Sequence, residues 1–275
     1  MPISVIILTF NSQATIGATL ESARRVSDDI HVVDSFSTDR TLEIARLAGV
    51  HVVQHPFENY GAQRNWAIET LTLQHDWQLH LDADERLSDE LARLLPGLTR
   101  TGQSDGVVGY YIPRLVHFHQ RPLRHGGMYP IYHLRLFRRG RGRCETRKYD
   151  QHFQVEGPTA NLDAPMIDDI RLPLGEWTAR HNRWADMEVD EILNPDSAAI
   201  AGGSGSPVAV KRSQRDFYYR QPMFLRAFLL FLYRYIWKRG FLDGTEGLIF
   251  YVLQTLWFRF LVDAKLYERR KAQGA

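Results

Sequence analysis

The residues best suited to chemistry form an acidic motif, Asp82-Ala83-Asp84-Glu85, directly after a strand-like run at 77–82. Two carboxylates two residues apart at the end of a strand can address one cation. Mg²⁺ and Mn²⁺ prefer oxygen ligands and keep coordination positions for substrate phosphates. The motif therefore predicts a site for Mg²⁺ or Mn²⁺ on Asp82 and Asp84, where the cation would neutralise a departing nucleotide diphosphate. A solvated acidic loop, or a helix N-terminus with a favourable dipole, is the alternative interpretation, because isolated aspartate pairs at this spacing are common.

Two further motifs stand where a nucleotide could be held. Asp34 ends the apolar run 30–34 and could accept hydrogen bonds from a base or a ribose. Arg64 stands near the start of a predicted helix, 62–73, where backbone N–H groups and a guanidinium favour a phosphate. The alternatives are a surface arginine at position 64 and ordinary helix-capping residue types at 37–39, after Asp34.

The elements that must position these residues alternate between two periods. Apolar runs of strand length lie at 3–10, 30–34, 50–54 and 77–82, and helical patterns lie at 14–23, 41–48, 62–73 and 88–95, the last stopped by Pro96. This alternation predicts an α/β fold, a Rossmann-like and mostly parallel sheet with helices on both faces. Ligands of such sheets bind beyond the carboxyl ends of the strands. Asp34 and Asp82 each stand at such an end.

The pattern changes after the first hundred residues. Strand-like runs at 106–113 and 133–138, with a hairpin over 116–122, predict antiparallel or mixed additions to the sheet. A stretch of small residues then predicts a flexible linker. We therefore divide the chain into an α/β half (1–100), a mixed-sheet half of the same domain (101–195), a linker (196–212) and an amphipathic helical tail (213–275).

The tail holds two aromatic-rich helical segments, 222–238 and 246–267, interrupted by basic residues. Neither segment offers the roughly 20 apolar residues that a membrane span requires. Aromatic and basic residues on such helices favour a position in the plane of a membrane interface. The alternative is an amphipathic pair packed on the protein's own core.

Composition narrows the function. The 275 residues carry 34 Lys and Arg against 32 Asp and Glu, so the net charge of +2 argues against a general nucleic-acid-binding protein. The one cysteine, Cys144, excludes an intramolecular disulfide and a metal site built on thiolates, and fits a reducing compartment. The first residues, 1–8, lack the basic region and cleavage site of a signal peptide, so we expect a cytoplasmic protein.

Taken together, the motifs resemble a known family. The resemblance rests on four ordered motifs: Val5-Ile6-Ile7-Leu8-Thr9-Phe10-Asn11, Val33-Asp34-Ser35 with Ser37-Thr38-Asp39, Gln63-Arg64-Asn65 with Ala67, and Leu81-Asp82-Ala83-Asp84-Glu85. They are similar to those of the family 2 glycosyltransferases with a GT-A fold, and of these the bacterial lipopolysaccharide-core and cell-envelope transferases of the WaaE/KdtX type. The later stretches 135–138 and 240–244 resemble the same group.

The resemblance implies inverting transfer of a sugar from a nucleotide-diphosphate donor, with UDP expected, to a hydroxyl of a cell-envelope glycan or a lipid-linked acceptor. It implies a metal on Asp84 with Asp82, and a nucleotide held by Thr9, Asn11, Asp34, Arg64 and Asp82. The expected location is the cytoplasm, peripheral on the inner face of the plasma membrane through the C-terminal helices.

An inverting transfer also needs a base for the acceptor hydroxyl. Asp150 is favoured for this role, ahead of Glu145 and Glu156. Two other functions remain in view. A non-catalytic protein that binds nucleotide sugars at the membrane is the main alternative. A sugar nucleotidyltransferase is disfavoured, because residues 9–13 lack the glycine-rich loop with a basic residue that its chemistry needs.

Overall fold

The computed structural model describes residues 2–100, 106–146, 151–194 and 207–274. The described chain forms two compact units. The first takes its residues from Met1–Val116, Pro130–Thr146 and Gln151–Asp169. The second takes its residues from His117–Tyr129 and Ile170–Ala275.

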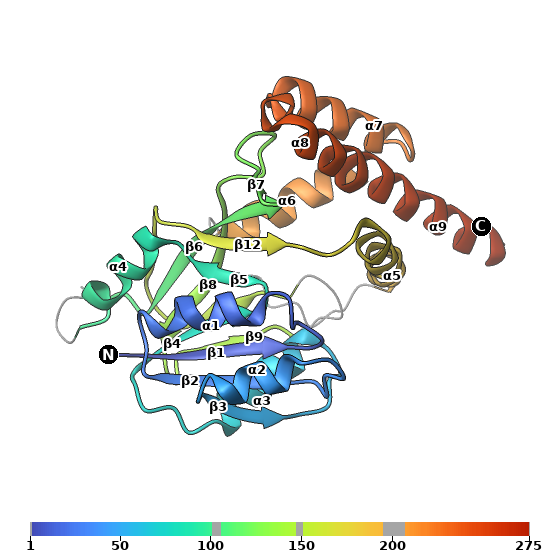
Figure 1. Ribbon diagram of the computed structural model, residues 1–275. Coiled ribbons are helices and arrows are strands. Elements are labelled where there is room, and N and C mark those ends of the chain that lie inside the picture. The colour runs from blue at the N-terminus through green and yellow to red at the C-terminus, as the bar shows by residue number, and fades with distance from the viewer. Residues whose placement is uncertain (1, 101–105, 147–150, 195–206, 275) are drawn as a thin grey trace. The chain divides into compact units, whose positions relative to one another are not determined.

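The first unit is built on parallel strands that alternate with helices, and this confirms the predicted α/β fold. The strands pair side by side in the order β3 (His51–Gln54), β2 (Asp29–Asp34), β1 (Ile3–Thr9) and β4 (Trp77–Asp82). The connecting helices are α1 (Ile16–Arg24), α2 (Thr41–Leu47) and α3 (Tyr60–Thr70), which pack around the strands in Figure 1.

The period of two along the buried strands explains how both faces of this sheet are covered. Ile3, Val5 and Ile7 of β1 face a core built with α1, α2 and α4 (Asp89–Leu98). Ile6 and Leu8 face the other way, into a second core that includes Ala67 of α3. Successive side chains of a strand point to opposite faces, so a continuous apolar run is what a sheet covered on both sides requires.

The remaining strands extend this sheet, as the changed pattern after residue 100 predicted. β8 (Ile131–Arg138) runs antiparallel to β4, and the order continues through β6 (Gly109–Phe118), β12 (Met166–Ile170) and β5 (Glu85–Leu87). Short strands β7 (Arg121–Pro122) and β11 (Thr159–Asn161) pair with β6, and β9 (Gly142–Cys144) pairs with β10 (Phe153–Val155).

Two boundaries differ from the prediction, both at prolines. The strand predicted to end at Pro113 continues to Phe118 before the hairpin turns, with Pro113 opposite Tyr132 of β8. The helix predicted to stop at Pro96 runs on to Leu98, and the N–H of Thr99 still closes on the carbonyl of Leu95. A proline removes its own N–H donor and crowds the preceding turn of a helix, but in both elements the pairing continues beyond it.

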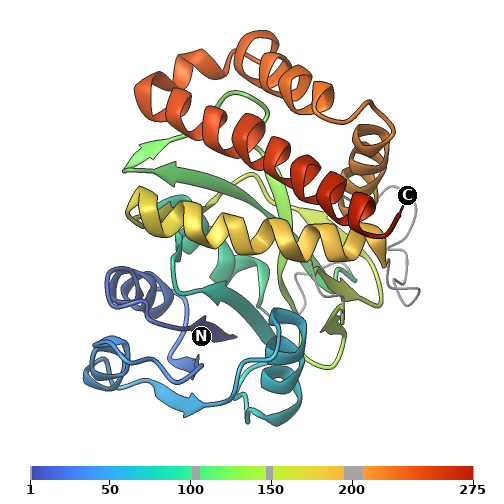
Figure 2. The ribbon, with the colours of Figure 1, turned by 90° about the vertical axis from the view of Figure 1, so that its right-hand side faces the viewer.

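The second unit is helical, which confirms the predicted C-terminal extension. Its helices are α5 (Leu174–Leu193), α6 (Pro207–Tyr219), α7 (Leu225–Leu232), the π-helical η1 (Tyr233–Trp237), the 3₁₀ helix η2 (Gly240–Asp243), α8 (Gly244–Tyr251), the π-helical η3 (Val252–Trp257) and α9 (Phe258–Ala272). Figure 2 shows α5 and α9 side by side, and their contact buries Ala185, Val189, Phe258, Val262 and Leu266.

Two parts of the second unit were not expected. The sequence analysis placed no helix over 174–193, yet this segment forms the long helix α5. Most of the predicted linker, 196–212, lies outside the described residues, but 207–212 belong to α6. The small residues of this stretch had predicted a flexible linker, so the start of α6 was not expected.

The length of the last helix also corrects the prediction. Residues Gly240–Ala272 form one continuous helical run, because η2, α8, η3 and α9 follow one another without a break. By length and composition alone this run is able to cross a membrane, with a mean hydropathy of 1.3 in a window that is 39% buried. A core helix of a soluble protein passes the same test.

Candidate active site

The residues predicted to hold a nucleotide meet at one edge of the first unit's sheet. β1 lies between β2 and β4, with Thr9 paired to Asp34 and Leu8 paired to Asp82. The three strands are parallel, so Thr9, Asp34 and Asp82 all stand at their carboxyl ends. This is the edge at which open α/β sheets bind ligands.

Asp34 is fully buried and fixed by the loop that follows it. One carboxylate oxygen accepts hydrogen bonds from the Ser37 N–H (2.9 Å) and the Gln54 side-chain amide (3.0 Å), and the other accepts from the Ser37 hydroxyl. Asn11 joins this loop to the end of β1: its N–H donates to the Ser37 hydroxyl (2.8 Å), and its side-chain oxygen accepts from the Thr38 N–H (2.8 Å). Asn11 therefore holds two loops of the edge together.

Thr9 carries a buried hydroxyl that has no hydrogen-bond partner within the described residues. Leaving a buried polar group unsatisfied costs about 1–3 kcal/mol, so such a group normally takes an ordered water or a ligand as its partner. Phe10 and Phe36, on the loops after β1 and β2, are 58% and 52% exposed. The edge thus combines an unsatisfied hydroxyl, a fixed carboxylate and exposed aromatic rings.

Asp82 lies between two arginines. Arg64 donates to both of its carboxylate oxygens, at 3.0 and 3.2 Å, and Arg135 donates to one of them at 2.9 Å. Burial by itself would raise the pKa of Asp82, but the Arg135 and Arg64 guanidiniums outweigh burial and hold that pKa well below its usual range. Asp82 is therefore an ionised carboxylate at any physiological pH.

Glu85 and Arg135 close a ring around the acidic motif. Arg135 also donates to one Glu85 oxygen (2.5 Å), and the other Glu85 oxygen accepts from the Asp82 backbone N–H (3.0 Å). Burial raises the pKa of Glu85, against the lowering effect of Arg135. Burial would lower the pKa of Arg135, but Glu85 and Asp82 reverse this and raise it. Sequence reasoning missed both roles; a basic residue within the apolar strand run 133–138 was the available signal.

Asp84 stands between the two ring carboxylates in sequence. Its side chain is half-buried, and its carbonyl accepts from the Asp169 N–H at 2.9 Å. Among the residues that the structure describes, no group of three or more His, Cys, Asp or Glu side chains could hold a metal. Mg²⁺ and Mn²⁺ need only one or two carboxylates beside substrate phosphates, so Asp84 is sufficient as a candidate ligand. Both carboxylate oxygens of Asp82, the second predicted ligand, accept hydrogen bonds from arginines in this structure.

The motif Gln63-Arg64-Asn65 ties α3 to three neighbouring elements. Gln63 donates to the Ser35 hydroxyl (3.2 Å) after β2, and Arg64 binds Asp82 at the end of β4. Asn65 exchanges two hydrogen bonds with the backbone of Cys144 in β9, at 2.9 and 2.7 Å. Arg64, predicted near a nucleotide or diphosphate, is therefore 9% exposed and engaged with a carboxylate.

Glu145 follows Cys144 and lies beside the start of α3. Its carboxylate accepts from the His152 N–H (3.1 Å) and the Gln154 side-chain amide (2.8 Å), and the residue is 8% exposed. A Cβ at Gly61 would stand 2.1 Å from the Glu145 carbonyl oxygen, so only glycine allows this approach. Asp150, the favoured base, lies outside the described residues.

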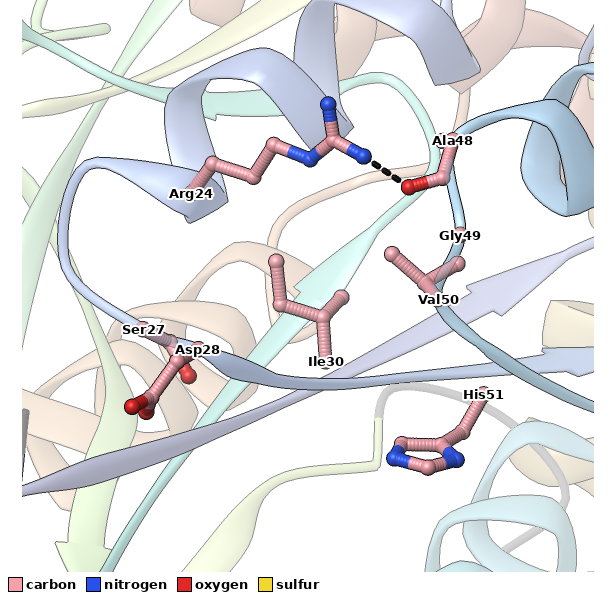
Figure 3. A pocket seen from close by; sticks show the side chains of 8 residues that line it. All are labelled: Arg24, Ser27, Asp28, Ile30, Ala48, Gly49, Val50 and His51. Carbon is pink, nitrogen blue, oxygen red and sulfur yellow. Dashed lines mark hydrogen bonds between the residues drawn. The ribbon is translucent and has the colours of Figure 1, made fainter.

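A cavity of about 130 Å³ lies elsewhere in the first unit. Figure 3 shows its lining, in which Arg24 donates to the carbonyl of Ala48. Asp28 and His51 in this lining stand where β2 and β3 begin, whereas Asp34 ends β2. The cavity is therefore at the amino ends of the strands and forms no part of the site at the carboxyl ends.

Comparisons with known proteins agree with this geometry. The family model for Glycosyl transferase family 2 matches residues 4–153. The chain is 27% identical to the lipopolysaccharide core biosynthesis glycosyltransferase LpsC of Rhizobium meliloti, over 98% of this chain and 93% of that protein. It is 38% identical to an uncharacterized glycosyltransferase of Rickettsia bellii, over 42% of this chain and 38% of the relative.

Among solved structures, the fold is similar to that of the mannosyltransferase PcManGT from Pyrobaculum calidifontis, solved in complex with GDP-Man and Mn²⁺. The TM-score is 0.50, at 14% sequence identity, over 97% of this chain and 87% of that one. At this identity the likeness concerns the fold alone.

Proposed function

The chain belongs to glycosyl transferase family 2. We propose that it transfers a sugar from a UDP-linked donor to a hydroxyl of a lipid-linked cell-envelope saccharide. We propose further that the transfer inverts the configuration at the anomeric carbon. The observation that carries the proposal is the meeting of Thr9, Asp34 and Asp82 at the carboxyl ends of three adjacent parallel strands. The name of LpsC, which concerns lipopolysaccharide core biosynthesis, supports the class of acceptor.

In this proposal the nucleoside lies over the ends of β1 and β2. The Thr9 hydroxyl gains the hydrogen-bond partner that it lacks, the Asp34 carboxylate accepts from the base or ribose, and the exposed rings of Phe10 and Phe36 offer flat apolar surface to the base. Asn11 contributes by holding the two loops in register. The Mn²⁺ with which PcManGT was solved supports a divalent cation here.

Asp84 would hold that cation together with the donor's phosphates. Asp82, which is paired with Arg64 and Arg135, would be its second carboxylate. When bound, Mg²⁺ or Mn²⁺ supplies positive charge that offsets the charge of the leaving diphosphate. The acceptor oxygen bonds to the anomeric carbon, and the bond from that carbon to the phosphate oxygen breaks with its electron pair on the diphosphate. The acceptor proton passes to a carboxylate on the opposite side, Asp150 or Glu145.

The Thr9 hydroxyl gives the most direct test of donor binding. In a thermal-shift screen with Mn²⁺ and UDP-, GDP-, CMP- and dTDP-sugars, we expect a UDP-sugar to raise the Tm most, since a ligand at 100 times its Kd adds about 2.7 kcal/mol. Thr9→Val should leave the Tm without donor equal or higher, because it loses no hydrogen bond and removes an unsatisfied buried hydroxyl, and it should shrink the donor-induced shift. An undiminished donor-induced shift in Thr9→Val would contradict the placement of the nucleoside at this edge.

The base is tested by removing one carboxylate at a time. The variant that lacks the base, Asp150→Asn or Glu145→Gln, should lose about 10²–10⁴-fold in kcat with little change in the KM for donor. Glu156→Gln, which removes the third candidate carboxylate of the same segment, should keep its turnover when the base is Asp150 or Glu145. Product stereochemistry by NMR checks inversion in the same reaction. Full turnover in both variants, or a product with retained configuration, contradicts the proposed mechanism.

An acceptor carried by lipid requires the enzyme to work at a membrane. We place it in the cytoplasm, peripheral on the inner face of the plasma membrane. The second unit supports this location, because many of its aromatic and aliphatic side chains are exposed.

A further inference from the structure

Exposed apolar side chains of the second unit run along α7, at Leu225, Phe228, Leu229 and Leu232, and continue to the place where η1 turns back into η2. This hairpin tip, Tyr233–Leu242, exposes Tyr233, Ile236, Trp237, Phe241 and Leu242, with Trp237 at 79% and Ile236 at 55%. Lys238 and Arg239, at the turn itself, are exposed as well. Exposed apolar side chains gathered at one turn, with basic residues among them, are typical of an interaction surface.

The hairpin tip is held in place from behind by a polar loop. Buried Asp243 accepts from the backbone N–H groups of Arg124 (3.0 Å) and His125 (3.1 Å), and the Gly126 N–H donates to the Lys238 carbonyl (3.0 Å). In Figure 1 this loop, in green after β7, lies against the turn between α7 and α8. The exposed rings therefore stand on a fixed frame, and they do not belong to a fraying end.

Buried ion pairs decide how the last helix can meet a bilayer. Asp263, within the run Gly240–Ala272, is 0% exposed and paired with Arg226 of α7, and it also accepts from the Phe224 N–H at 2.7 Å. Arg259 of the same run binds Glu188 of α5 at 2.7 Å. Drawing the helix across a membrane would strip these charges of their partners, which is strongly unfavourable. The run is therefore a packed helix of the second unit, despite its apolar composition.

We infer that the hairpin tip is a monotopic insertion element, which enters the interface of an anionic bilayer while α9 stays packed on α5. The tryptophan and aliphatic side chains suit burial of about 5–10 Å at the headgroup boundary. Lys238 and Arg239 suit anionic headgroups, at about 1 kcal/mol for each basic residue near the surface. The inference rests on the proposed function in one respect, which is that a lipid-linked acceptor is located in a membrane.

Vesicle binding by the full chain tests this inference. We expect wild-type protein to co-sediment with phosphatidylcholine vesicles that contain phosphatidylglycerol, and Trp237→Glu with Phe241→Glu to lower the partition coefficient at least about tenfold. The matched control is Phe217→Glu with Tyr267→Glu, two exposed residues outside the tip, which should bind as wild type. Lys238→Gln with Arg239→Asn should reduce only the dependence on anionic lipid; asparagine suits the φ of 58° at position 239.

Two readouts separate this inference from its rivals. Bound vesicles should protect the chain from trypsin at Lys238 and Arg239, and donor-induced thermal shifts should be equal in tip variants and wild type. Equal vesicle binding by the tip variant and its control overturns the inference. So does light scattering that shows a wild-type dimer which the tip variant dissociates, because the tip would then be a contact between copies of this chain. Neither result touches the proposed transferase activity, which the donor and turnover assays report separately.

Discussion

Replacing Asp84 with asparagine should reduce metal-dependent sugar transfer by about a thousandfold and leave the fold intact. A bound cation contributes several kcal/mol to stabilising charge on a leaving group, and each 1.36 kcal/mol is a factor of ten in rate. Asparagine keeps the size of the side chain, and the backbone carbonyl of residue 84 still accepts from the Asp169 N–H, so the loop should stay in place. The measurement is nucleotide release with Mn²⁺ varied, beside a thermal melt of each protein.

Asp89→Asn provides the matched control, because Asp89 is a nearby carboxylate that is 81% exposed and paired only at the surface with Arg25. Surface pairs of this kind contribute about 0–1 kcal/mol, so the control should keep its turnover. Asp82→Asn is a poorer test, since it leaves Arg64 and Arg135 without their shared carboxylate and perturbs the fold as well. Undiminished metal-dependent turnover in Asp84→Asn would defeat the assignment of that residue to the cation.

The sequence was sufficient to predict the edge of the sheet because that edge depends on local patterns. Apolar runs of strand length, each followed by a helix, allow only a few topologies, and nearly all of them bring the carboxyl ends of parallel strands together. Asp34 and Asp82 could therefore be placed at one edge although they are far apart in the chain. Thr9 came with them, since it ends the strand that lies between theirs.

The partners of the acidic motif could not be predicted in this way. Arg135 reaches Asp82 only because β8 runs antiparallel beside β4, a pairing between segments more than fifty residues apart in the sequence. No local period encodes that register. The short strand β5, which carries Glu85, depends likewise on β12 for its pairing. The burial of the charged residue Glu188 in α5 is equally hidden from the sequence, because its partners Tyr219 and Arg259 lie far along the chain.

Removing Arg135 should cost more stability than any surface substitution. Arg135 and Glu85 are 5% and 2% exposed, and breaking a buried ion pair from one side typically costs about 3–5 kcal/mol because a charge is left uncompensated. We therefore expect Arg135→Gln to lower the free energy of unfolding by about this amount at neutral pH. Urea denaturation followed by circular dichroism measures it. Arg138→Gln, which removes a cation that lies over the Trp77 ring, is the control, and it should cost about 1 kcal/mol or less.

The pH dependence of that loss distinguishes an uncompensated carboxylate from a simple packing defect. The pKa of Glu85 is already raised by burial, and without Arg135 it should rise further. A carboxyl group whose pKa is raised in the folded state keeps its proton there while the unfolded chain loses it. The stability of Arg135→Gln should therefore be highest near the ordinary pKa of glutamate, and it should fall as the pH rises through the raised value. Asp82 does not reverse this trend, because Arg64 remains and the pKa of Asp82 lies below the range.

Glu85→Gln combined with Arg135→Gln removes both charges, so it should recover much of the loss and show no such slope. The loss of stability could instead be independent of pH in the single variant and equally large in the double variant. Arg135 would then stabilise the fold by packing alone, and Arg64 alone would keep the carboxylates of the acidic motif ionised.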